Sequence, residues 1–215
     1  MKEKLFIILA ILLIPVMLES CCGKTFRYSV MPGELRLQVF STTDFNIPDV
    51  AEIESDNVAI HFNFPDAIIE TMAYHNPFSF GNTAYATSCN DEFIYVPDVK
   101  SVSIISDHDF DENHPAGSEL SGLFKGVRYY YSGDEDGQVS GNTASEYTNL
   151  KDAVTDYFML LNYQRQYNPD NAQHPFIVFK PSERNSATGT FVFTVRVTFT
   201  NDAVATAATI PLTLH

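Results

Sequence analysis

Tryptophan is absent from the sequence and basic residues are scarce, and both shortages limit the partners that the protein can bind. Lysine and arginine together number 13, against 27 aspartate and glutamate residues, so the net charge is −14. A surface of this charge repels the phosphates of nucleic acids and anionic lipid head groups, which excludes nucleic acid as a partner. The lack of tryptophan, a common stacking surface, lowers the expectation of glycan binding, although tyrosine can replace it.

The sequence also lacks the short motifs of the common catalytic and metal-binding classes. There is no HExxH or CxxC pair for zinc and no GxSxG elbow for a nucleophilic serine. Paired carboxylates that cleave a glycoside need no fixed spacing, so a hydrolase stays as the weakest of three hypotheses. We therefore expect a protein that is not an enzyme and has no cofactor, apart from the Ca²⁺ candidate described below.

Long apolar runs are missing too, except at the N-terminus. Lys2 and Lys4 precede an apolar segment, residues 5–18, which is shorter than the roughly 20 residues that cross a bilayer as a helix. A basic start, a short apolar run and a small residue, Ser20, are the parts of a secretory signal. Residues 1–20 are therefore predicted to be a signal peptide. An uncleaved membrane anchor and secretion without a lipid are the alternatives.

Cys21 directly follows Ser20, and this arrangement resembles the lipobox of bacterial lipoproteins with a type II signal peptide. In that family the cysteine receives a diacylglycerol, the signal is cut before it, and the new amine is acylated. The resemblance thus implies that Cys21 is the lipidated first residue of the mature chain, a firm anchor. Glu19 departs from the family pattern, which has a small or apolar residue there. Because Cys22 rather than aspartate follows, the resemblance also implies sorting to the outer membrane, facing the periplasm or the outside.

Roughly 195 residues remain after this cleavage, enough for one domain with a sizeable core. Residues 21–33 are predicted to be a lipid-anchored tether, and residues 34–215 a single domain. Once Cys21 carries the lipid, Cys22 and Cys89 are left over. An oxidising periplasm allows these two to form a disulfide; a free Cys22 with a buried Cys89 is the equal alternative.

Alternation of apolar and polar residues dominates the mature chain and predicts β-strands. The clearest strand covers residues 190–200, where every second side chain is apolar. Residues 208–214 are expected to pair back against it, with Ile210, Leu212 and Leu214 pointing inward.

Residues 175–180 are apolar on both faces, which predicts a central strand. His61 falls on the polar face of its predicted strand, so we expect it at the surface or in an interface and not as a zinc ligand. The other predicted strands cover residues 35–39, 58–64, 93–96 and 102–105.

One amphipathic helix is predicted, with Thr148 or Asn149 as its N-cap and an end near Asn162. A second, weaker helix is expected over residues 65–74, with proline at its first position. The apolar residues that repeat at helical spacing in the first helix are Leu150, Val154, Tyr157, Phe158 and Leu161.

Short strands separated by turn residues, closing with a long hairpin, predict a mainly β, antiparallel two-sheet sandwich, immunoglobulin-like or related, with the helix across one end or edge. Long polar loops are expected over residues 107–122 and 133–149. This layout, with its Cys-Cys start and terminal strand pair, resembles that of uncharacterised β-sandwich envelope lipoproteins of Gram-negative gut anaerobes. The resemblance implies no particular activity.

Asp107, Asp109 and Asp111 alternate along the first of these loops, and carboxylates spaced in this way can converge on Ca²⁺. An EF-hand is excluded because Glu112 stands where glycine is needed and Ser118 where the final acid is needed. A looser Ca²⁺ site and a solvated acidic loop are both open. A second acidic stretch, residues 134–137, is expected to be a plain turn.

Tyr129, Tyr130 and Tyr131 must expose at least one ring if they lie on a strand, because successive side chains point to opposite faces. Exposed tyrosines suit contact with a protein or a glycan. Packing of an edge strand beneath the 133–149 loop is the favoured alternative. The sequence as a whole predicts a lipid-anchored envelope protein that serves as a binding or adhesion-type module, or else as a structural component of an envelope complex.

Overall fold

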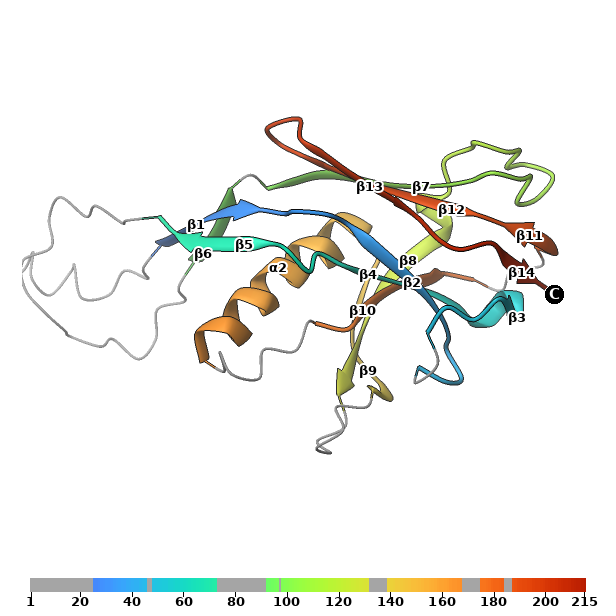
Figure 1. Cartoon of the computed structure of the whole chain (residues 1–215), viewed down its shortest axis with the longest axis horizontal. Coiled ribbons are helices and arrows are strands. Elements are labelled where there is room, and N and C mark those ends of the chain that lie inside the picture. The colour runs from blue at the N-terminus through green and yellow to red at the C-terminus, as the bar shows by residue number, and fades with distance from the viewer. Residues whose placement is uncertain are drawn as a thin grey trace, which may run out of the picture.

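The computed structural model describes residues 25–45, 48–72, 92–96, 98–131, 139–167, 175–183 and 187–215, which form a mainly β, two-layer sandwich with one α-helix (Figure 1). The first layer is a five-stranded antiparallel sheet in the order β2-β4-β10-β8-β9. Its strands are β2 (Arg36–Ser41), β4 (Val58–Asn63), β8 (Phe124–Tyr131), β9 (Val139–Tyr147) and β10 (Ile177–Pro181). The predicted sandwich is therefore confirmed.

The second layer is built around the C-terminal hairpin, in the orders β13-β12-β7 and β11-β14-β3. Its strands are β3 (Glu52–Ile53), β7 (Val99–Ser106), β11 (Gly189–Phe191), β12 (Phe193–Phe199), β13 (Val204–Ala208) and β14 (Leu212–Leu214). The predicted strand over residues 190–200 is thus divided at Val192, and each part pairs with a different strand. Leu212 and Leu214 are buried as expected, but Ile210 lies between β13 and β14 and is exposed, so its inward placement is wrong.

The core lies between the layers, where apolar side chains from both sheets meet. Ile60 and Phe62 of β4 face Val195 and Val197 of β12, and all four are fully buried in one cluster. Alternation explains this for β12, whose odd-numbered residues are buried while the even-numbered ones are not. β10 is buried on both faces and has a neighbour on each side, which confirms the predicted central strand.

The helix α2 (Leu150–Tyr167) closes one side of this core. The Asn149 side-chain oxygen accepts the backbone N–H of Lys151 at 2.9 Å, so Asn149 is the N-cap. Tyr157 accepts the buried N–H of Phe64 at 2.9 Å through its hydroxyl. The helix runs past the expected end at Asn162, because Arg165 donates to the Ala67 carbonyl 2.5 Å away and keeps the last turns packed.

A third sheet, in the order β5-β1-β6, corrects two predictions. β1 (Thr25–Met31) lies inside the predicted tether, and β5 (Ile68–Thr71) lies inside the predicted helix over residues 65–74. β1 pairs antiparallel with β5 and parallel with β6 (Glu92–Val96). The β-branched residues of β5 favour a strand, and a partner distant in sequence supplies the pairing that a local pattern cannot show.

The expected loop over residues 133–149 is wrong for Val139–Tyr147, which form β9, and residues 133–138 lie outside the described residues. β8 consequently has β10 on one side and β9 on the other, so it is not an edge strand. Two short 3₁₀ turns complete the described elements, η1 (Ser55–Asn57) and η2 (Ser121–Leu123). In the part of the chain that is described, no helix has the length and apolar character needed to cross a membrane.

Candidate functional site

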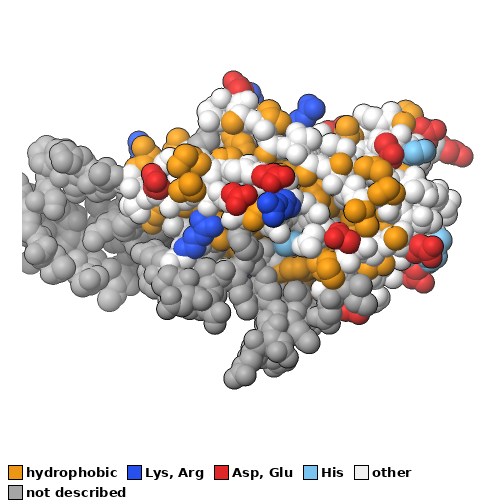
Figure 2. Space-filling view, viewed as in Figure 1, with side chains coloured by type: hydrophobic (Ala, Val, Ile, Leu, Met, Phe, Trp, Pro, Cys, Tyr) orange, Lys and Arg blue, Asp and Glu red, His pale blue; other side chains and the backbone are white. Residues whose placement is uncertain are grey.

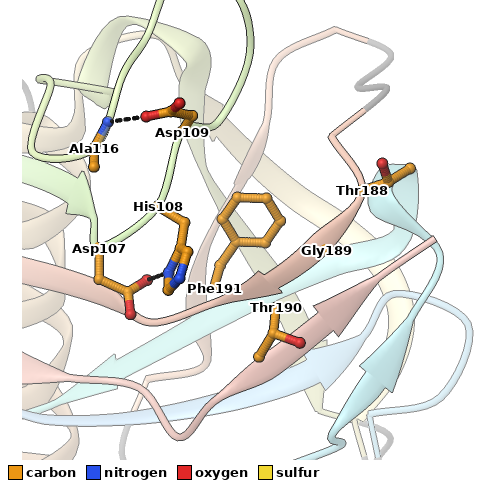
Figure 3. A pocket seen from close by; sticks show the side chains of 8 residues that line it. All are labelled: Asp107, His108, Asp109, Ala116, Thr188, Gly189, Thr190 and Phe191. Atoms are coloured by element: carbon orange, nitrogen blue, oxygen red, sulfur yellow. Dashed lines mark hydrogen bonds and ion pairs between the residues drawn. The ribbon is translucent and has the colours of Figure 1, made fainter.

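The acidic loop that follows β7 borders an open hollow of about 340 Å³ where it meets β11 (Figure 3). The side chains at its rim come from two elements, the loop and the residues around β11. They are Asp107, His108, Asp109, Ala116, Thr188, Thr190 and Phe191, with Gly189 contributing backbone. Two of the three predicted Ca²⁺ ligands, Asp107 and Asp109, lie here.

Asp107 hydrogen-bonds the loop to Val192, the residue between β11 and β12. Its carboxylate accepts the N–H of Val192 at 2.7 Å, and its own N–H donates to the Val192 carbonyl at 3.2 Å. The His108 imidazole lies 3.0 Å from the same carboxylate oxygen. Partial desolvation opposes ionisation of Asp107, but the hydrogen bonds from His108 and Val192 outweigh it and lower its pKa. This carboxylate therefore has a structural use.

Asp109 and Asp111 are engaged in the same way, within the loop itself. Asp109 accepts the Ala116 N–H at 2.8 Å. Asp111 accepts the N–H groups of Asn113 and His114 at 2.8 and 2.9 Å, and the His114 ring nitrogen lies 2.7 Å away. The hydrogen bond from His114 is the main reason that the pKa of Asp111 is lowered.

The structure does not bring the three carboxylates together. Asp107 accepts from Val192, whereas Asp109 and Asp111 accept from donors within the loop. The described residues include no group of three or more His, Cys, Asp or Glu side chains placed to hold a metal ion. The hydrogen bonds instead give the loop its shape, as short acidic side chains commonly do in turns.

Glu119, near the end of this loop, has a role that sequence patterns did not reveal. Its carboxylate accepts the N–H groups of Ile104 and Ser121 at 3.1 and 2.9 Å and also contacts the hydroxyls of Ser103 and Ser121. Desolvation opposes its ionisation, but these donors prevail and lower its pKa. Glu119 thus covers part of the β7 edge, which a carboxylate can do only after the chain has folded back.

Tyr129, a candidate contact residue, and His61, expected at the surface, are both buried on the outer side of the five-stranded sheet. The Tyr129 ring lies 4.5 Å from that of Phe45, and His61 stacks on Phe176 at the same distance. Phe45 and Phe176 cover Tyr129, so this residue follows the favoured alternative of packing and not the contact role. Burial also raises the pKa of the Tyr129 hydroxyl. The side chains of Tyr130 and Tyr131 lie outside the described residues.

A second hollow, also of about 340 Å³, contains a basic pair that sequence analysis missed. Lys125 of β8 and Lys180 of β10 are directly opposite each other across the two strands. Glu146 of β9 lies 2.8 Å from the Lys125 amine, and this hydrogen bond lowers the pKa of Glu146. One of the two positive charges is thereby neutralised, which relieves the repulsion between the lysines.

The remaining predicted residues, Cys21, Cys22, Cys89 and the acidic turn over residues 134–137, lie outside the described residues. Their roles stay predictions. Comparison of the chain with protein-family models, with curated proteins and with solved structures gave no match.

The edge of β13 is a third surface feature, and it concerns the backbone. The Ala203 carbonyl accepts the Phe199 N–H, and the Thr209 N–H donates to the Phe193 carbonyl, both at 2.9 Å. The backbone N–H and C=O groups of the odd-numbered residues of β13 therefore point toward β12. The backbone groups of the even-numbered residues therefore point away from β12. Among the described strands, β13 is hydrogen-bonded to β12 alone; β2 approaches it from the other layer without pairing. The outward residues are Val204, Thr206 and Ala208, all with exposed side chains.

Proposed function

We propose that this protein is a lipid-anchored component of the cell envelope whose sandwich is a non-catalytic protein-binding module. The N-terminal signal pattern and Cys21 support the anchor. The edge of β13 carries the binding proposal, because it presents a row of backbone donors and acceptors on a strand that has no charged residue.

Such an edge suits the addition of an extended segment from a partner. Proteins commonly protect edge strands with lysine, proline, a bulge or a covering loop, because unpaired backbone groups recruit other strands. β13 reads Val-Ala-Thr-Ala-Ala, and Val204 is 55% exposed. In strand addition the main chain supplies the affinity, while alternate side chains select the partner. Val204 and Thr206 are the side chains that a partner would meet on the outer face.

The test replaces one outward N–H. Thr206→Pro removes the Thr206 backbone N–H, which does not take part in the hydrogen bonds between β13 and β12. Proline is tolerated on an edge strand at such a position. We expect cross-linking of the full lipidated chain to its envelope partner to fall roughly fivefold or more, since each lost hydrogen bond contributes about 1 kcal/mol. Thr206→Ser keeps the donor and should behave like the wild type. Equal cross-linking by both variants, with melting temperatures unchanged, would reject β13 as the binding edge.

The alternative role is a structural component of an envelope complex, and pairing of two copies of this chain through the same edge is one way to build such a complex. Two copies of β13 can pair antiparallel without charge conflict, because the strand carries none. Sedimentation of the wild type and Thr206→Pro decides between the roles. A dimer that Thr206→Pro dissociates supports self-assembly, whereas a monomer in both leaves a different protein as the partner.

The anchor has its own test. In a Gram-negative expression host, labelled palmitate should be incorporated into the wild type and not into Cys21→Ser. Cys22→Ser is the matched control, because it changes the neighbouring thiol and leaves the predicted acylation site. Incorporation that survives Cys21→Ser would show that Cys21 is not the lipidated residue.

A further inference from the structure

The outer face of the β5-β1-β6 sheet gathers exposed apolar side chains. Val30 and Tyr95 point into the core, so the alternate residues of these strands point outward. Met31 lies directly opposite Ile68 across the two strands. Figure 2 shows hydrophobic side chains on the surface at this end of the molecule. The exposed residues are Met31, Ile68, Met72 and Val96, each 44% to 49% accessible, and they are half of the large apolar side chains that the described chain exposes.

The described side chains of this face carry balanced charge. Among its described side chains the charged ones are Arg27 on β1 and Glu70 on β5, one of each sign. The chain as a whole carries −14, so this face differs from the average surface in charge as well as in polarity. An apolar surface with balanced charge suits the interfacial region of a bilayer made of neutral lipids. The anionic remainder of the protein surface gains no electrostatic attraction from such a bilayer.

The position of this sheet in the chain points to the membrane as its partner. β1 is the central strand of the sheet, and it begins at Thr25, four residues after Cys21. Four residues span at most about 14 Å when fully extended. Met72 donates its N–H to the carbonyl of Arg27, so the apolar face begins within two residues of the start of β1. A lipid on Cys21 therefore holds the start of β1 within about 14 Å of the bilayer.

We infer that the outer face of β5-β1-β6 lies on the bilayer, with Met31, Ile68, Met72 and Val96 in the interfacial region of neutral lipids. The inference rests on the proposed lipid anchor at Cys21. The face then orients the domain on the membrane; β3, β11 and β14 lie at the opposite end of the long axis of the molecule (Figure 1).

The absence of tryptophan makes the test direct, because one introduced indole is the only indole in the protein. Ile68→Trp places it on the proposed face, and Ile210→Trp places a matched indole at a 39% exposed position between β13 and β14. Each lipidated full chain is reconstituted in phosphatidylcholine vesicles with and without brominated acyl chains. We expect the Ile68→Trp emission to shift to the blue and to be quenched about twofold or more, with Ile210→Trp unchanged. Met72→Trp repeats the measurement if Ile68→Trp does not fold.

Three other results overturn the inference and can be told apart. Vesicle flotation without quenching of Ile68→Trp or Met72→Trp means that the anchor holds but the face does not touch lipid. A blue shift without quenching, growing with protein concentration, means that a second copy covers the face. Failure of the wild type to float, with the same result for Cys21→Ser, means that the anchor is absent, and the inference falls with the proposed function.

Discussion

Gly126 of β8 marks the closest approach of the sheet to helix α2, and Gly126→Ala tests this packing. A Cβ built at Gly126 would lie 2.5 Å from the Cβ of Ala153 on α2. Carbon atoms in contact prefer about 3.5–4.0 Å, so the helix must move outward by about 1 Å or more. Overpacking of this kind costs about 1–3 kcal/mol. For a domain of this size, about 2 kcal/mol lowers the melting temperature by about 4–8 °C.

The assay is thermal and urea unfolding of the domain, with a matched control and a rescue. Gly122→Ala is the control, because a Cβ there meets nothing within 4 Å and should change stability by less than about 0.5 kcal/mol. Adding Ala153→Gly to Gly126→Ala removes the opposing methyl. The double variant should recover part of the loss, because residues in contact do not contribute additively. If Gly126→Ala is as stable as Gly122→Ala, the helix does not pack on β8 as described.

Two further predictions concern the core and the acidic loop. Tyr157→Phe removes the acceptor of the buried Phe64 N–H and should cost about 1–3 kcal/mol in urea unfolding. Burial raises the pKa of Tyr157 to about 12, so the unfolded chain loses this proton first; stability should fall as the pH rises from 10 to 12, and less so in Tyr157→Phe. Millimolar Ca²⁺ should leave the melting temperature unchanged, because Asp107 already accepts a hydrogen bond from Val192 and Asp109 and Asp111 accept hydrogen bonds from within the loop. A rise of several degrees that Asp109→Ala abolishes would contradict this and restore the Ca²⁺ site.

The elements that follow a local period are those that sequence analysis located. β12 alternates strictly, β10 is apolar on both faces, and α2 repeats at helical spacing after an Asn149 cap, so the class of fold and the centre of one sheet were predictable. β1 shows the same alternation in Phe26, Tyr28 and Val30, and it was mistaken for a tether because of its closeness to Cys21. β5 is too short for a period to be decisive, and only its pairing with β1 settles it.

The sequence by itself determined the acidic character, the apolar N-terminal segment, the strand-rich fold and the start of the helix, because composition and short-range periodicity carry this information. Only the tertiary structure decided which polar residues are used and how. Asp107 accepts the N–H of Val192, Glu119 accepts an N–H at the edge of β7, and the Phe45 ring covers Tyr129. Each of these contacts joins residues that are separated in the sequence. A local pattern indicates which face of an element a residue occupies, whereas long-range packing decides whether that face contacts solvent or another element.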